Sequence, residues 1–179
     1  IIVRFVSWQA SHDIGQHGIQ DKVGLVKTLE QYGRVLVTSE GALPPELQPY
    51  QIRLSPEKLH NLLYYAALYV GEGGTMAAEA AVLGTPSIYV SSLSSKMGYI
   101  IDLEENYGNL YSFTDERTAL SKAVELLKDG ATKGDRTIKR EQIINDKSDV
   151  TAFMIWFIEN YPQSFAEVKT SDNKYNRNI

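Results

Sequence analysis

The sequence contains no cysteine among its 179 residues, which excludes disulfide bonds and thiolate metal sites. Long apolar runs are also absent. The run of residues 153–158, for example, is far shorter than the roughly 20 residues that a membrane-spanning helix needs. The sequence shows neither a secretory signal nor a lipidation motif. We therefore expect a cytoplasmic protein without a transmembrane segment.

Charge of either sign is not in large excess. A formal net charge of −4 argues against a general nucleic-acid-binding surface, so we expect no nucleic-acid partner. Hydrophobic residues make up 43% of the chain and charged residues 22%, values that are ordinary for a folded globular domain. The length suits one α/β domain with a well-formed core.

Short apolar segments alternate with helical patterns along the chain. Strands are predicted over residues 1–6, 34–38, 51–54, 68–70, 87–90 and 109–113. This alternation predicts a Rossmann-like, open and mostly parallel sheet with helices on both faces. We expect the domain to span residues 1–162 and a polar, mobile tail to occupy residues 163–179. Because the chain begins within a predicted core strand, we expect it to be the second half of a longer protein whose N-terminal domain is missing.

The stretch of residues 69–90 has the pattern of a compact βαβ unit. Gly73 and Gly74 lie where the chain turns out of a strand, Thr75 opens an alanine-rich helix, and Gly84 ends it. A helix N-terminus with free backbone N–H groups suits an anion such as a phosphate. Alternatively, the glycines only permit a tight turn. The sequence has neither a G-x-G-x-x-G fingerprint nor a P-loop, which disfavours NAD and ATP.

Glu79 lies one turn into this helix, among alanines. A carboxylate in that place can accept two hydrogen bonds from a vicinal diol such as a ribose. The alternative is a solvated helix carboxylate favoured by the helix dipole.

Residues 72–86, EGGTMAAEAAVLGTP, resemble the nucleotide-sugar signature of GT-B-fold proteins. They are similar to the S-G-[AG]…E…G-x-P segment of the N-acetylglucosaminyltransferase that makes lipid II. They are also similar to the S-G-G…E-E…L-G-x-P segment of UDP-N-acetylglucosamine 2-epimerases. The segments SWQASHDIG and SSLSSKMGY resemble an uncharacterised prokaryotic family with a predicted GT-B-like fold, a likeness that extends to about Pro162.

The resemblance implies that the chain is the C-terminal half of a GT-B fold and that particular residues hold a UDP-sugar. The turn of Glu72, Gly73, Gly74 and Thr75 would hold the diphosphate, although Glu72 replaces a small serine of the pattern. Glu79 would bind the ribose hydroxyls. Ile52 and Leu54 would lie where relatives grip the base; alternatively, they are strand core.

Two further loops carry candidate catalytic residues. His12 and Asp13 could act as a general base and its orienting carboxylate, and His17 lies in the same loop. Equally, these residues belong to a polar loop that caps local backbone. Lys96 follows a serine-rich segment, and its charge could stabilise a leaving diphosphate.

These features predict the nucleotide-sugar-binding half of a GT-B glycosyltransferase, which transfers a sugar to an acceptor without a metal or cofactor. The missing N-terminal domain would supply the acceptor site, so this part alone would be inactive. One alternative is an enzyme like the UDP-N-acetylglucosamine 2-epimerases, which would share the donor pocket. The other is a non-catalytic nucleotide-binding or assembly module, because a fold does not determine a function.

Overall fold

The computed structural model describes residues 1–9, 14–93, 97–130 and 133–170. The chain divides into two compact units, residues 1–140 and 141–179. The first unit is built on one parallel sheet with the strand order β2-β1-β3-β4-β5. Its strands are β1 (Ile2–Phe5), β2 (Leu36–Ser39), β3 (Tyr69–Gly71), β4 (Ser87–Val90) and β5 (Leu110–Phe113).

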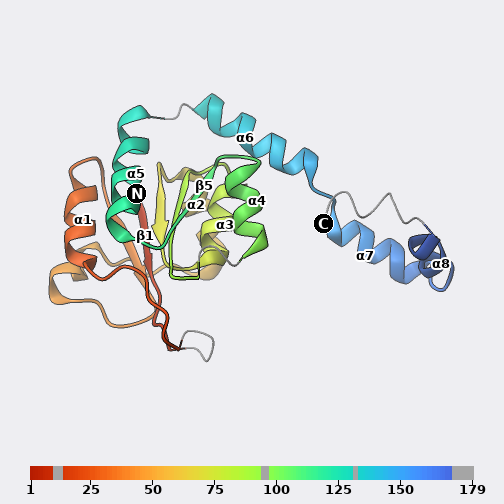
Figure 1. Ribbon diagram of the computed structural model, residues 1–179, viewed down its shortest axis with the longest axis horizontal. Coiled ribbons are helices and arrows are strands. Elements are labelled where there is room, and N and C mark those ends of the chain that lie inside the picture. Colours follow the sequence, from red (N-terminus) through yellow and green to blue (C-terminus); the bar gives the residue numbers. More distant parts are fainter. Residues whose placement is uncertain (10–13, 94–96, 131–132, 171–179) are drawn as a thin grey trace. The chain divides into compact units, whose positions relative to one another are not determined.

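Helices cover both faces of this sheet. Helices α1 and α5 lie on one side of it, and α3 and α4 lie on the other, where α2 packs against α3 (Figure 1). Among the described residues of this unit, the helices and 3-10 turns are α1 (Lys22–Glu30), η2 (Pro45–Tyr50), η3 (Pro56–Lys58), α2 (Leu59–Tyr65), α3 (Gly74–Val82), α4 (Gly98–Glu105), α5 (Glu116–Asp129) and the start of α6 (Lys133–Asp146).

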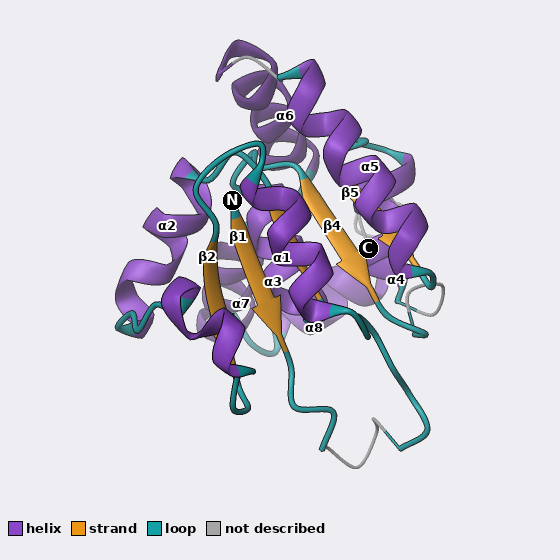
Figure 2. Ribbon diagram, turned by 90° about the vertical axis from the view of Figure 1, so that its left-hand side faces the viewer, coloured by secondary structure: helices purple, strands orange, loops and turns teal. Residues whose placement is uncertain are grey.

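The central strands are apolar because both of their faces are covered. Val3 of β1 pairs with Val37 of β2 on one side and with Val70 of β3 on the other, and all three are fully buried. The strand arrows point the same way, so all carboxyl ends lie at one edge (Figure 2). The predicted Rossmann-like α/β fold is thus confirmed.

The order of the strands places a topological switch point between β1 and β3. The chain passes from β1 outward to β2 and then returns to form β3 on the opposite side of β1. In open α/β sheets, ligands bind outside the carboxyl ends of the strands near such a point. The first candidate region is therefore where the segments after β1 and β3 meet.

The strand predicted over residues 51–54 is wrong. Only Gln51 forms an isolated parallel bridge with Val37, and the Ile52 N–H donates to the Val37 carbonyl at 2.9 Å. Leu54 is exposed rather than part of the core. The pairing stops at once because the chain leaves the sheet edge to enter η3, which begins at Pro56.

Arg136 of α6 joins the ends of two other helices. Its guanidinium donates to the carbonyl oxygens of Ala66 at 2.7 Å and Gly84 at 3.1 Å, which follow α2 and α3. It also donates to the Thr85 hydroxyl at 2.7 Å. A charged donor satisfies the carbonyls that helix ends leave unpaired, so α2 and α3 are held in a defined relation.

The second unit is helical. Its described residues contain the remainder of α6, α7 (Val150–Glu159) and α8 (Gln163–Thr170). Helix α8 covers residues 163–170, which is all of the predicted tail that the structure describes. Ser164 is buried, and its hydroxyl donates to the Phe157 carbonyl at 2.6 Å.

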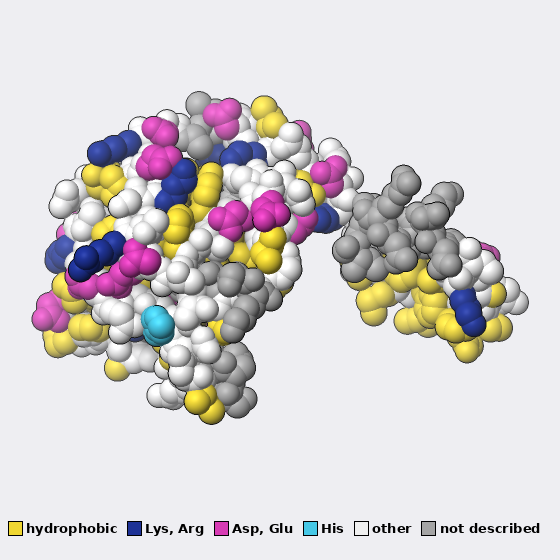
Figure 3. All heavy atoms as spheres, in the orientation of Figure 1, with side chains coloured by type: hydrophobic (Ala, Val, Ile, Leu, Met, Phe, Trp, Pro, Cys, Tyr) yellow, Lys and Arg dark blue, Asp and Glu magenta, His cyan; other side chains and the backbone are white. Residues whose placement is uncertain are grey.

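Helix α7 is apolar but exposed. All of its residues are described and none is buried; Met154, Ile155 and Ile158 are each more than half exposed. Hydrophobic side chains gather over α7 and α8 in the face shown by Figure 3. Within the described residues, no helix is both long enough and apolar enough to cross a membrane.

Candidate functional site

The turn between β3 and α3 is shaped by a buried tyrosine. The Tyr69 hydroxyl lies 3.4 Å from the Gly73 carbonyl oxygen, to which it donates. Burial raises the pKa of Tyr69, so the hydroxyl stays protonated as a donor. A Cβ at Gly71 would collide with this side chain and lie 3.0 Å from the Arg4 carbonyl oxygen. Glycine is therefore required at the end of β3 for steric reasons.

The N-terminus of α3 has no side-chain cap within the described part of the chain. Gly73 is its N-cap residue, and the Gly73 carbonyl accepts the Ala77 N–H at 3.1 Å. The N–H groups of the first turn have no partner inside the helix and carry its partial positive charge. Because Gly74 has no side chain and Thr75 is exposed, the helix presents these groups and a hydroxyl together.

Glu72 is directed away from this helix end and into the protein. It is 3% exposed, and its Oε2 and Oε1 accept the backbone N–H groups of Val6 at 2.9 Å and Ile19 at 2.8 Å. Its own N–H donates to the Arg4 carbonyl at 3.2 Å. The Glu72 carboxylate thus joins the segments after β1 and before α1 to the end of β3.

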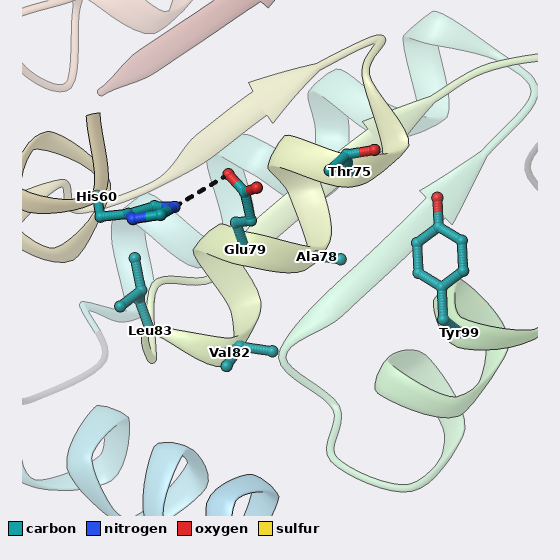
Figure 4. A pocket seen from close by; sticks show the side chains of 7 residues that line it. All are labelled: His60, Thr75, Ala78, Glu79, Val82, Leu83 and Tyr99. Carbon is teal, nitrogen blue, oxygen red and sulfur yellow. Dashed lines mark ion pairs between the residues drawn. The ribbon is translucent and has the colours of Figure 1, made fainter. Parts of the chain in front are cut away.

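A cavity of about 620 Å³ runs along α3. Thr75 and Glu79 lie one turn apart on the same side of the helix, because residues four apart share a face. His60 of α2 reaches in from one side, with Nε2 3.5 Å from Oε2 of Glu79, and Tyr99 of α4 stands on the other side (Figure 4). The remaining wall is apolar and is formed by Ala78, Val82 and Leu83.

A second cavity, of about 320 Å³, lies at the carboxyl ends of the strands. It shares Thr75 and Tyr99 with the cavity along α3, so the two are neighbours. Partial burial raises the pKa of Tyr99, which keeps its hydroxyl neutral; this hydroxyl lies 3.2 Å from the sulfur of Met97. The other lining residues are Val6, Ser7, Trp8, Glu40, Glu72, Gly73, Gly74, Tyr89, Ser91, Leu93 and Met97.

The structure brings some of the predicted site residues together and not others. Gly73, Gly74, Thr75 and Glu79 share one helix and line the two cavities between them. Glu72 is adjacent, but its carboxylate is committed to backbone N–H groups. In contrast, Ile52 and Leu54 line neither cavity.

The candidate catalytic residues His12, Asp13 and Lys96 lie outside the described residues. The neighbouring His17 is described. Its N–H donates to the Ser92 hydroxyl at 3.1 Å, and its carbonyl accepts the Ser92 N–H at 2.9 Å. The predicted first loop and the serine-rich segment therefore meet at this point.

His60, Tyr99 and Trp8 are among the lining residues that were not identified from the sequence. His60 and Tyr99 come from helices other than α3, so no spacing relative to Glu79 indicates them. Trp8 had one available signal, since it is a large aromatic residue in a polar segment. Among the described residues, no three His, Cys, Asp or Glu side chains are grouped closely enough to hold a metal ion.

The fold and the cavities define a Rossmann-like α/β domain with a ligand-sized hollow beside a helix N-terminus. Residues 51–161 match the model of the family described as Protein of unknown function (DUF354), and the chain belongs to this family. None of the curated proteins matches it.

A solved structure of the glycotransferase of kitacinnamycin is similar to part of the chain, with a TM-score of 0.46 and 16% sequence identity. The match covers 81% of this chain and 40% of that protein, so the chain corresponds to less than half the length of that protein.

Proposed function

We propose that this chain binds a nucleotide sugar, specifically a UDP-sugar, and forms the donor-binding part of a GT-B glycosyltransferase. The observation that carries the proposal is the cavity along α3, in which Glu79 lies one turn from Thr75 and from the uncapped helix N-terminus. Such a cavity offers an acceptor for hydroxyl groups and donors for an anion, the two polar functions that a nucleoside diphosphate requires.

The diphosphate would lie at the start of α3. The N–H groups after Gly73 and the hydroxyl of Thr75 can donate to phosphate oxygens there, and the helix dipole favours negative charge. When the bond between sugar and diphosphate breaks, charge develops on the leaving phosphate, and donors already in place lower the energy of that state.

The nucleoside would extend along the helix. The Glu79 carboxylate is 37% exposed and can accept hydrogen bonds from both ribose hydroxyls. The apolar wall of Val82 and Leu83 lies beyond it and suits the face of a base, with His60 at the rim. In this arrangement the phosphates, ribose and base would lie along about two turns of one helix.

Isothermal titration calorimetry tests the proposal. UDP and UDP-N-acetylglucosamine are titrated into the wild-type chain and into the Glu79→Ala variant. Loss of the charged acceptor should lower the affinity for both ligands by about 10- to 100-fold, which corresponds to the free energy of one or two hydrogen bonds to a charged group. The control is Glu125→Ala, because Glu125 is also an exposed helix carboxylate paired with a basic side chain, Lys122.

Two results would overturn the proposal. One is the absence of measurable binding of either ligand to the wild-type chain. The other is equal binding by wild type and Glu79→Ala. Product analysis then separates sugar transfer to an acceptor from epimerisation of the sugar, and variants of His12, Asp13 and Lys96 test the proposed catalytic residues.

A further inference from the structure

Trp8 has an unusual backbone conformation at the wall of the second cavity. Its φ is 55°, in the left-handed region that a bulky side chain rarely adopts, and no other described non-glycine residue has a positive φ. Trp8 is only partly exposed and lines the cavity together with Glu40 and Ser91.

Two carboxylates hold the backbone immediately before Trp8. The Val6 N–H donates to Oε2 of Glu72 at 2.9 Å, and the Ser7 N–H donates to Oε2 of Glu40 at 3.2 Å. Glu40 is fixed in turn by the Arg4 guanidinium, 2.8 Å from its Oε1. A strained residue persists only where its surroundings determine its conformation, and here the ends of β2 and β3 both do so.

The indole ring of Trp8 packs against Gly18. Gly18 has no side chain, and a Cβ there would lie 2.7 Å from Cζ2 of Trp8 and 2.6 Å from Oε1 of Glu72. The close approach of Gly18 therefore leaves room for the ring beside the Glu72 carboxylate. The indole of Trp8 thus lies at the wall of the cavity, packed against Gly18.

We propose that the second cavity binds the glycosyl group of the nucleotide sugar, with Trp8 as the platform on which the sugar ring stacks. The inference rests on the function proposed above, because the cavity adjoins the diphosphate position at Thr75. A pyranose has one face of C–H groups that packs on an aromatic ring and a rim of hydroxyls that needs polar partners. Glu40, whose side chain is 43% exposed, provides an acceptor at that rim.

The size of the cavity is consistent with one ring. Its volume of about 320 Å³ lies at the lower end of the range of about 300–1,000 Å³ for small-molecule sites. The larger cavity along α3, about 620 Å³, is left for the nucleoside. The pair of cavities therefore divides the ligand into two parts that can be tested separately.

The binding test compares ligands with and without the sugar. UDP, UDP-N-acetylglucosamine and free N-acetylglucosamine are titrated into wild type, Trp8→Ala and Trp8→Phe, whose folding is checked by circular dichroism. Trp8→Ala should bind the UDP-sugar about tenfold more weakly, the upper end of the value of an aromatic contact, and should bind UDP as wild type does. Trp8→Phe should restore most of the loss because it keeps an aromatic face.

Tryptophan fluorescence gives an independent signal. The chain has two tryptophans, so the Trp156→Phe variant leaves Trp8 as the only tryptophan. The UDP-sugar should change the emission of Trp8, whereas UDP should not.

Three outcomes have distinct meanings. If the wild-type chain binds neither UDP nor the UDP-sugar, the proposed function fails and this inference fails with it. If wild type binds both, and Trp8→Ala binds the UDP-sugar as tightly or loses both ligands equally, the sugar subsite alone is overturned. Binding of free N-acetylglucosamine that Trp8→Ala abolishes, without any effect on the UDP-sugar, assigns the cavity to an acceptor saccharide and also overturns the inference.

Discussion

Oε1 of Glu72 accepts the backbone N–H of Ile19 at 2.8 Å, although 53 positions separate the two residues in the sequence. The other oxygen of the same carboxylate accepts the Val6 N–H. One buried side chain therefore ties the residue after β3 to the segments that leave β1 and enter α1. Val6 and Trp8 line the second cavity and belong to the segment that leaves β1. Their positions therefore depend on the hydrogen bonds of Glu72.

We predict that Glu72→Gln lowers the free energy of unfolding by about 1–3 kcal/mol, the cost of leaving a buried donor unsatisfied. An amide has one acceptor oxygen, so its NH₂ group would face one of the two backbone N–H groups. Urea denaturation measures the change. Glu116→Gln is the control, since Glu116 also accepts two backbone N–H groups, from Gln20 and Asp21, but is less buried. Equal losses in the two variants would contradict the prediction.

Gly71 and Gly73 should differ in their tolerance of a side chain. Gly71→Ala places a Cβ against the Tyr69 side chain and the Arg4 carbonyl, so we expect a loss of about 1–3 kcal/mol from overpacking. Gly73→Ala meets nothing closer than 3.7 Å and should cost about 0.5–1 kcal/mol through its weaker capping. Thermal denaturation of both variants tests which substitution destabilises the protein more. A larger loss of stability for Gly73→Ala would contradict the steric role of Gly71.

Thr75 should contribute to phosphate binding. Thr75→Val keeps the shape of the exposed side chain but removes the hydroxyl. This substitution should lower the affinity for UDP by about tenfold. Uridine lacks phosphates, so its affinity should be unchanged, and Thr75→Ser should retain UDP binding. Calorimetry with UDP and uridine makes the comparison. An equal loss of affinity for UDP and uridine would show that Thr75 does not contact the phosphates.

Asp115 should make the stability of the folded protein depend on pH in the acid range. The Thr118 hydroxyl and then the Thr118 N–H hold the pKa of the Asp115 carboxyl below its ordinary value of 3.8. A lowered pKa in the folded state means that the carboxylate stabilises the protein above about pH 3.8 and that this contribution is lost as the pH falls through the lower value. Because the group is exposed, salt should weaken the effect.

The test of this dependence compares wild type with Asp115→Ser, which keeps a capping oxygen but cannot titrate. Melting temperatures measured from pH 7 to pH 2 should converge as the pH falls, with wild type the more stable at pH 7. A difference that stays constant across the range would contradict the assignment.

The fold was predictable where the pattern is local. The strand of residues 87–90 was predicted with the bounds of β4, because a short apolar run that follows Pro86 admits few alternatives. The helix predicted to open at Thr75 begins at Gly74. The strand prediction for residues 51–54 was wrong. The apolar pair in this segment indicated a strand, but a strand forms only if the chain stays beside β2 long enough to pair with it, and here the pairing is limited to one bridge.

The site was predictable only in the part that lies on one helix. Thr75 and Glu79 are four residues apart, so the sequence alone places them on the same face. The approach of His60 and Tyr99 depends on how α2 and α4 pack against α3, which no local pattern encodes. The hydrogen bonds of Glu72 were likewise hidden, because its partners, Val6 and Ile19, are distant in sequence.

The buried position of Glu72 also limits which ligands the domain can accept. The crevice between β1 and β3 is the passage through which a dinucleotide crosses a doubly wound sheet. Here a side chain of the protein fills that passage and pairs with the backbone on both sides of it. A cofactor that straddles the sheet would have to displace a satisfied carboxylate. We therefore expect the domain to favour ligands that stay on the α3 side of its sheet.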